Sequence, residues 1–374
     1  MLVGRTEEQL QLASSVGALL SEIASEAEVR RLMATSTAED ATSWGRICDM
    51  GLPGLAVPER LGGAGGTLVD QGVVLEQMGR ALYCGPYFST AVLAVQTLLH
   101  LQDEAAEELL RQVCTGTLSA TLAITEASGR WDEAGVTLQA ERGESSWLLT
   151  GTKTFVPDGA SAELVLVVAR TAAGTGVFAV GPAAQGVRRT PLPTMDQTRK
   201  QARLDFSATP ATLLGTDGDG WRGVDAALAA ATAGLAAEQV GGAQRVLDMT
   251  VEHARTREQF GRPVGTFQAV QHKCATMLVE VEAAKSAAYF ALATAADGSP
   301  ELPVVASLAK AYCSQAYRRT ANEAIQIFGG IGLTWEHPVH LYFKRARSSE
   351  VFLGSPALHR ERLAAHLAIG SNAS

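Results

Sequence analysis

The sequence predicts an α+β protein with an N-terminal helical domain (1–118), a middle antiparallel β domain (119–215) and a C-terminal four-helix bundle (216–374). Three observations predict this order. Apolar residues recur at helical spacing in the first third, short β-rich runs follow, and long alanine-rich segments fill the last third. A chain of 374 residues is also too long for one hydrophobic core, so roughly two or three domains are expected.

The first segment is predicted to be mostly helical. Val73–Leu82 has apolar residues at helical spacing, and residues 93–114 are expected to form one or two more helices. The stretch GLPGLAVPERLGGAGGT at 51–67 is rich in glycine and proline and is expected to be a loop. An earlier helical face is formed by Leu10, Leu12, Val16, Leu19, Leu20 and Ile23.

The middle segment changes to short β-rich runs separated by turn residues such as Gly143 and Gly174-Thr175-Gly176. This spacing predicts a compact antiparallel sandwich or barrel of about 95 residues. The runs are LSATLAITE, GVTLQAE, SWLLTGTKTFVP, ELVLVVART, GVFAVG and ARLDF.

The C-terminal segment is predicted to contain three long helices over 224–255, 266–296 and 302–328. The second is expected to stop at Asp297-Gly298 and the third at Gly329-Gly330, because glycine favours helix C-termini. Their many small residues allow helices to approach closely in a bundle.

Composition excludes several classes of function. A net charge of −8 and a pI near 5.5 argue against nucleic acid as the main partner. The N-terminus lacks a signal-peptide layout, and no apolar run is long enough for a membrane helix. The five cysteines are far apart without a CxxC pair, so reduced thiols and a cytoplasmic location are expected.

Two C-terminal stretches form a strong combined motif: ARTREQFGRPVGTFQAVQHKCA at 254–275 and ANEAIQIFGGIGLTWEHPVHLYFKRAR at 321–347. With GLPGLAVPERLGGAGG (51–66), AITE (123–126) and LTGTKTFVPDGASAELVLVVAR (149–170), they resemble the acyl-CoA dehydrogenase family over nearly the whole chain. The resemblance implies the acyl-CoA dehydrogenase fold, FAD as cofactor and an acyl-CoA thioester as substrate. It also implies a tetramer and an electron-accepting flavoprotein as partner.

Four matched residues are those that a family subunit presents to its neighbour. The family's equivalents of Arg257 and Phe260 contact the FAD of a neighbouring subunit, and those of Gln326 and Gly330 approach its adenine-side phosphates. A guanidinium can bind a pyrophosphate bidentately, and glycine lets backbone N–H groups come close to phosphate. Alternatively, Arg257 forms a surface ion pair and Gln326 is an ordinary polar residue of a helix.

Two further residues match positions that serve the subunit's own FAD. Thr125, in AITE, matches the threonine that serves the flavin pyrimidine ring, and Phe155 matches an aromatic residue placed against the flavin. Alternatively, Thr125 and Phe155 are strand residues whose side chains face the interior of the sheet.

The catalytic base is missing from its expected positions. The family reaction needs a carboxylate within hydrogen-bond reach of the substrate Cα, and a glutamate supplies it from one of two places. These places match Leu353 and Ala231. The substitute candidates are Glu238, two turns after Ala231 on the same helix face, and Glu350, three residues before Leu353. The catalytic residue is therefore left unassigned.

Other departures also fall at the catalytic face of the flavin. Arg130-Trp131 stands where the family has Gly-Ser. Pro157 stands where the family has a threonine that bonds near flavin N5, and proline cannot replace this donor because it has no N–H. The chain therefore resembles the subunit type that lacks the catalytic glutamate in heterotetrameric (α2β2) bacterial acyl-CoA dehydrogenases, some of which act on steroid side chains. Such a subunit completes the FAD site of a homologous catalytic partner.

Other functions stay open from the sequence. The chain can be a self-sufficient homotetrameric acyl-CoA dehydrogenase with a displaced base, a related flavoenzyme with different chemistry, or a scaffold without cofactor. His337 and His340 have a spacing that suits a metal, but no third ligand is near in the sequence, so no metal is expected.

Overall fold

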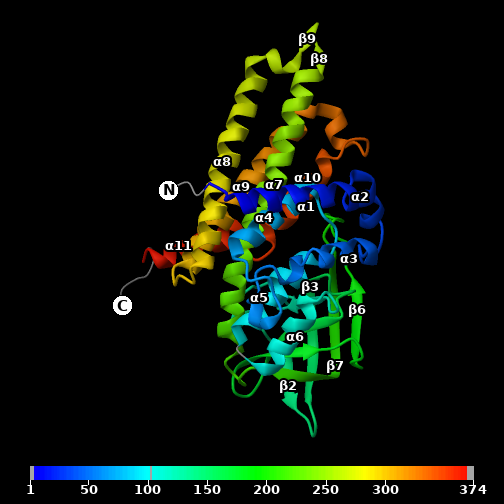
Figure 1. Ribbon diagram of the computed structural model, residues 1–374, viewed down its shortest axis with the longest axis vertical. Coiled ribbons are helices and arrows are strands. Elements are labelled where there is room, and N and C mark those ends of the chain that lie inside the picture. Colours follow the sequence, from blue (N-terminus) through cyan, green and yellow to red (C-terminus); the bar gives the residue numbers. More distant parts are fainter. Residues whose placement is uncertain (1–3, 102, 369–374) are drawn as a thin grey trace. The chain divides into compact units, whose positions relative to one another are not determined.

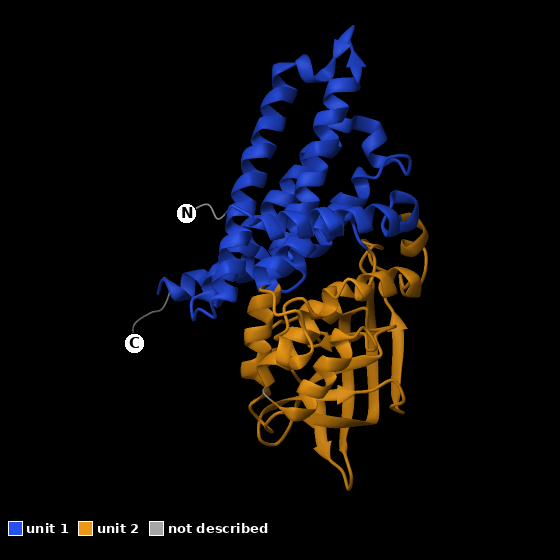
Figure 2. Ribbon diagram, viewed as in Figure 1, with its two compact units in different colours: residues 1–29, 68–83, 232–374 blue, residues 30–67, 84–231 orange. Residues whose placement is uncertain are grey.

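The structure, a computed structural model, describes residues 4–101 and 103–368. It divides into two compact units (Figure 2). Unit 1 comprises residues 1–29, 68–83 and 232–374, and unit 2 comprises residues 30–67 and 84–231. The predicted fold class is confirmed, since helical segments precede and follow a sheet domain (Figure 1). The expected boundaries at residues 118 and 215 remain a prediction.

The N-terminal helices begin at polar capping residues. Thr6 and Gln9 form a reciprocal capping box at the start of α1, and the Asp40 and Asp103 side chains cap α3 and α6. A π-helical stretch, Phe88–Ala94, precedes α5. The helices are α1 (Glu7–Ile23), α2 (Glu26–Met33), α3 (Ala41–Asp49), α4 (Leu68–Ala81), α5 (Val95–Leu101) and α6 (Glu104–Cys114).

The sheet of unit 2 closes on itself. Neighbouring strands pair in the order β4–β2–β3–β7–β5, and β5 pairs back to β4, around an apolar core that includes Leu149, Phe178 and Leu204. Most pairs are antiparallel as expected, but β1 and β2 run parallel to β4. The strands are β1 (Ala120–Ala123), β2 (Gln139–Arg142), β3 (Trp147–Pro157), β4 (Leu164–Arg170), β5 (Thr175–Val180), β6 (Val187–Pro191) and β7 (Gln201–Leu214).

Strand β6 of this sheet was not predicted. Its sequence, VRRTP, shows no alternation of apolar and polar residues, because the strand pairs only with β7 and leaves most of its side chains exposed.

Long helices dominate unit 1, where α4 packs against α8, and α9 packs against α8, α10 and α11. Glycines let α4 and α7 cross closely: a Cβ on Gly79 would meet the Glu238 carbonyl oxygen, and one on Gly241 would meet that of Glu76. No helix in the described part of the chain has the length and apolar character needed to cross a membrane. The elements are α7 (Gly220–Thr256), β8 (Glu258–Gln259), β9 (Arg262–Pro263), α8 (Gln268–Ala296), α9 (Leu302–Phe328), α10 (Val339–Val351) and α11 (Pro356–His366).

Candidate functional site

Phe260 lies at the tip of a hairpin that extends beyond α7. Strands β8 and β9 pair antiparallel, and Phe260 and Gly261 form the turn with φ of 54° and 75°. The Phe260 ring is 91% exposed and touches Phe267 edge-on. A large apolar ring displayed in this way is a suitable surface for a second molecule.

Arg257 lies directly after α7, at the base of this hairpin. Its backbone N–H donates to the His253 carbonyl oxygen at 2.8 Å, and its carbonyl accepts from Val264 at 2.8 Å. Its side chain is exposed and forms no ion pair with a carboxylate among the described residues. Burial, and then the charge of Arg257, lower the pKa of His253. The guanidinium of Arg257 is thus available to an anion.

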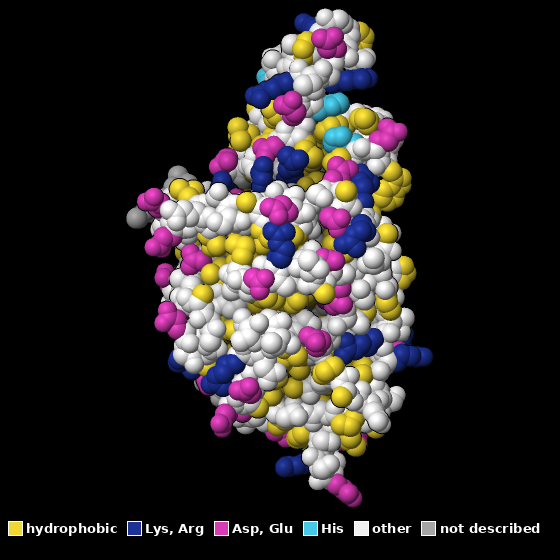
Figure 3. Space-filling view, turned by 45° about the vertical axis from the view of Figure 1, so that its right-hand side comes forward, with side chains coloured by type: hydrophobic (Ala, Val, Ile, Leu, Met, Phe, Trp, Pro, Cys, Tyr) yellow, Lys and Arg dark blue, Asp and Glu magenta, His cyan; other side chains and the backbone are white. Residues whose placement is uncertain are grey.

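Gln326 and Gly330 lie at the end of α9, which packs beside the end of α7. The Phe328 ring stacks on His253 of α7 at 4.3 Å and on His337 at 4.2 Å between ring centroids. Gln326 and Gly330 are exposed, and a Cβ on Gly330 would meet nothing within 4 Å. Unit 1 therefore brings the four residues matched to a neighbour's FAD to one end of the bundle. Figure 3 shows histidine, lysine and arginine side chains near the end of the bundle that carries β8 and β9.

Thr125, in unit 2, follows β1 and is tied to β3. Its hydroxyl donates to the Thr154 carbonyl oxygen at 2.5 Å, and its own carbonyl accepts from the Thr154 N–H at 2.8 Å. Thr125 is only 3% exposed, and its backbone N–H donates to no described residue. A buried N–H without a partner is rare, so this group suits an acceptor on a bound molecule.

Phe155 lies in an irregularity of β3, where the pairing with β7 shifts between Lys153 and Val156. Its φ is 55°, and its ring is 46% exposed instead of pointing into the sheet core. This backbone conformation is uncommon for a bulky residue and is typical of functional positions.

The residues that depart from the family motif have internal partners. The Pro157 carbonyl oxygen accepts from the Thr121 hydroxyl at 2.6 Å. Arg130 is exposed and forms two hydrogen bonds to Asp132, from Nε at 2.9 Å and from Nη2 at 2.7 Å. The Arg130 charge is thus partly satisfied by a neighbouring residue of its own loop.

Leu353 follows α10 in a tightly held turn. Its side chain is 3% exposed, and its φ of 59° is left-handed. Its carbonyl oxygen accepts from His359 Nε2 of α11 at 3.0 Å. Burial, and then the charge of Lys310, lower the pKa of His359 to about 4, so this ring is neutral at pH 7. Since a carbonyl can only accept, the proton is on Nε2, and Nδ1 accepts from Ser307 at 3.2 Å.

Lys310, on α9, forms hydrogen bonds to backbone carbonyls of the same turn. Its fully buried ammonium lies 3.1 Å from the Gly354 carbonyl oxygen and 3.0 Å from each of the Ser349 and Glu350 carbonyl oxygens. A fourth acceptor, the Ser314 hydroxyl, lies at 2.9 Å. At the C-terminal end of α10, Lys310 donates to carbonyls that have no partner within the helix.

Both substitute base candidates form ion pairs. Glu238 is 5% exposed and accepts from Arg345 at 2.9 Å, within the α7–α10 contact. Glu350 pairs with Arg318 at 3.1 Å and with Arg347 at 2.8 Å. Ala231, at the other expected base position, is fully buried in α7.

The sequence interpretation missed the buried network around Leu353. Lys310 and His359 lie on two different helices and meet the turn only after folding. A lysine within the apolar run of SLAKAYCSQ was the one available signal, because a charged residue there needs buried partners.

Models of the acyl-CoA dehydrogenase N-terminal, middle and C-terminal domains match residues 6–117, 121–208 and 218–368. The chain belongs to the acyl-CoA dehydrogenase family. Acyl-CoA dehydrogenase IpdE2 of Mycolicibacterium smegmatis is 35% identical over 363 residues, covering 97% of this chain and 99% of that protein.

Two solved structures are similar to this chain over nearly its whole length. The Tcur3481-Tcur3483 steroid ACAD superposes with a TM-score of 0.88 at 30% identity, covering 98% of this chain and 99% of the other. The ChsE4-ChsE5 complex from Mycobacterium tuberculosis superposes with a TM-score of 0.88 at 29% identity, with the same coverage.

The cofactor of the acyl-CoA dehydrogenase family is FAD. The residues present fit it. The N–H of Thr125, which donates to no described residue, and the exposed ring of Phe155 suit the polar and aromatic parts of a flavin. The exposed guanidinium of Arg257 and ring of Phe260 suit a phosphate and an apolar face of such a cofactor. Pro157 offers no donor at the position that the family gives to threonine.

Proposed function

We propose that this chain is the base-lacking subunit of a hetero-oligomeric acyl-CoA dehydrogenase that desaturates an acyl-CoA thioester. A homologous subunit supplies the catalytic glutamate, and this chain completes that subunit's FAD site with Arg257, Phe260, Gln326 and Gly330. The proposal includes a tetramer and an electron-accepting flavoprotein that reoxidises the cofactor. The steroid ACAD among the similar structures supports a bulky thioester, such as a steroid side chain, as the substrate.

The observation that carries the proposal is the contrast between the two sets of residues. At the expected base position, Leu353 is buried, and its turn is fixed by His359. The two substitute candidates, Glu238 and Glu350, each form an ion pair with arginine. By contrast, Arg257 and Phe260 are exposed and chemically suited to FAD.

The roles in the assembled site follow from residue chemistry. Bound FAD would supply a hydride acceptor for the substrate Cβ, and the partner's carboxylate would take the α-proton. In this chain, Arg257 would bind the FAD pyrophosphate and Phe260 would cover an apolar face of the cofactor. Neither residue needs to move a proton, so losing the glutamate leaves their role intact.

Apolar side chains exposed on the bundle support assembly with another subunit. Large apolar side chains are usually buried, so their exposure on two helices that pack together favours burial against another subunit. On α8 and α9 they are Leu278, Val279, Phe290, Leu308 and Tyr312.

Replacing Phe260 by alanine is expected to weaken FAD retention in the complex with a base-carrying homologue by about tenfold, because one aromatic contact is lost. Folding of this chain should be unchanged, since the ring is 91% exposed. The measurement is FAD affinity of the purified complex by fluorescence titration. Leu10→Ala, another exposed apolar position at 56%, is the control. Equal FAD affinity in both variants would remove Phe260 from the proposed site.

A further inference from the structure

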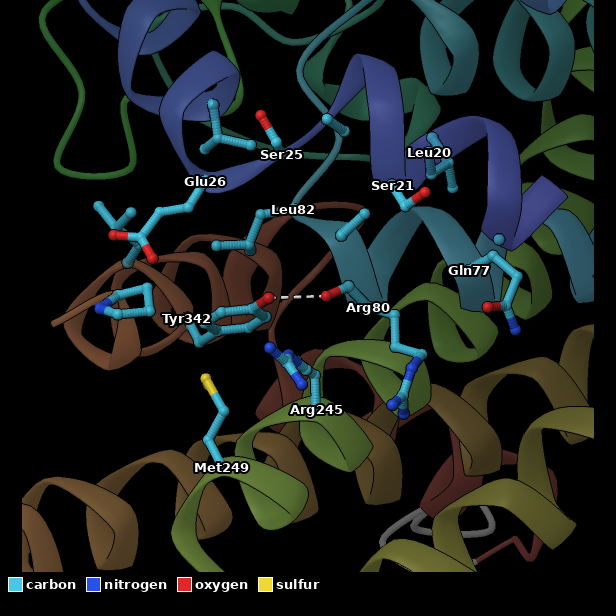
Figure 4. A pocket seen from close by; sticks show the side chains of 16 residues that line it. Leu20, Ser21, Ser25, Glu26, Gln77, Arg80, Leu82, Arg245, Met249 and Tyr342 are labelled. Carbon is cyan, nitrogen blue, oxygen red and sulfur yellow. Dashed lines mark hydrogen bonds between the residues drawn. The ribbon is translucent and has the colours of Figure 1, made fainter. Parts of the chain in front are cut away.

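A pocket lies within unit 1, among α1, the start of α2, α4, α7 and the start of α10. Its volume is about 300 Å³, which is at the lower end for small-molecule sites. Figure 4 shows Arg245 and Met249 on one side, with Ser25 and Glu26 opposite. None of the residues matched to FAD contacts lines it.

Arg245 is a charged residue of this pocket. It is exposed and forms no ion pair with a carboxylate among the described residues. It lies beside Tyr342, whose hydroxyl donates to the Arg80 carbonyl oxygen at 2.6 Å (Figure 4). Burial raises the pKa of Tyr342, so this hydroxyl keeps its proton and does not neutralise Arg245. The guanidinium of Arg245 therefore keeps its charge in the pocket.

The other arginine of the pocket is neutralised, because Arg80 pairs with Asp248 at 2.7 Å. Much of the remaining lining is apolar, and includes Leu20, Leu82, Leu341 and Met249. With Arg80 paired, Arg245 is the cation that the lining offers beside these apolar side chains. The lining therefore suits one negative charge attached to a short apolar body.

We propose that this pocket binds a small monocarboxylate with a short hydrocarbon chain, its carboxylate on Arg245 and its chain against Leu20, Leu82 and Met249. Arginine favours carboxylates because its planar fork can make two parallel hydrogen bonds. The pocket walls include α7 and α10, which are also joined by the Glu238–Arg345 ion pair. A bound molecule would therefore contact both helices. The inference is independent of the proposed partner-subunit role.

The test is titration calorimetry of the full chain, in the oligomeric state in which it purifies, with hexanoate as the probe. Hexanoate is expected to bind with a millimolar or lower dissociation constant, and hexan-1-ol to bind far more weakly. Arg245→Gln should weaken hexanoate binding at least tenfold. Arg255→Gln, an exposed arginine further along α7, should leave it unchanged.

A second variant, Met249→Glu, tests whether Arg245→Gln acts at the pocket itself and not through a change in folding. Met249→Glu places a negative charge in the pocket and should also abolish hexanoate binding, while thermal melting confirms that both variants fold. No hexanoate binding by the wild type, or equal binding by wild type and Arg245→Gln, would overturn the proposal.

Discussion

The chain produced alone is expected to dehydrogenate acyl-CoA about 10²–10⁴-fold more slowly than its complex with a base-carrying homologue, the usual effect of losing a general base. Leu353 offers no proton acceptor, and Ala231 is a buried methyl group. The measurement is turnover per bound FAD with an artificial electron acceptor, for the chain alone in excess free FAD and for the complex.

The matched control for this comparison is the complex in which the partner's glutamate is replaced by glutamine. It should be as slow as the lone chain, because both then lack the base. A lone chain that turns over at the rate of the complex would show that a carboxylate of this chain acts as the base. Glu238 would be the first candidate, despite its pairing with Arg345.

Replacing Lys310 by methionine is expected to lower the free energy of unfolding by about 2–4 kcal/mol at pH 8, because it leaves the buried carbonyls of Ser349, Glu350 and Gly354 without this donor. Urea unfolding measures the effect. Lys285→Met, on α8, is the control and should stay within about 0.5 kcal/mol of the wild type. Unfolding of Lys310→Met at the wild-type urea concentration would contradict the role assigned to Lys310.

The same variant should change the pH dependence of stability. Burial lowers the pKa of Lys310 to about 7 from an ordinary value of 10.5. Between these values the unfolded chain binds a proton that the folded chain does not, so stability from this group rises with pH from about 7 toward 10. The gap between wild type and Lys310→Met should widen over that range. The titratable groups facing Lys310 are Cys313, Glu350 and His359.

Much of the fold could be predicted because its signals are local. The long helices of the last third follow from apolar spacing and from stops such as Asp297-Gly298 and Gly329-Gly330. Strand β6 could not be found, because an exposed edge strand such as VRRTP needs no apolar alternation. The parallel pairing of β1 with β4 likewise depends on contacts between distant segments.

The candidate site was predictable only where a motif carries it. Arg257 and Phe260 follow from REQFG, but the exposure of the Phe260 ring comes from a hairpin turn seen only in the structure. The environment of Leu353 depends on Lys310 and His359, from helices that precede and follow it. The pocket around Arg245 is likewise assembled from helices far apart in sequence.

The most direct test of the partner-subunit account is the FAD content and native mass of the chain purified alone and after co-expression with a base-carrying homologue. The account predicts little bound FAD for the chain alone, and a heterotetramer with one FAD for every two chains after co-expression. A homotetramer of the lone chain with one FAD per chain would contradict it.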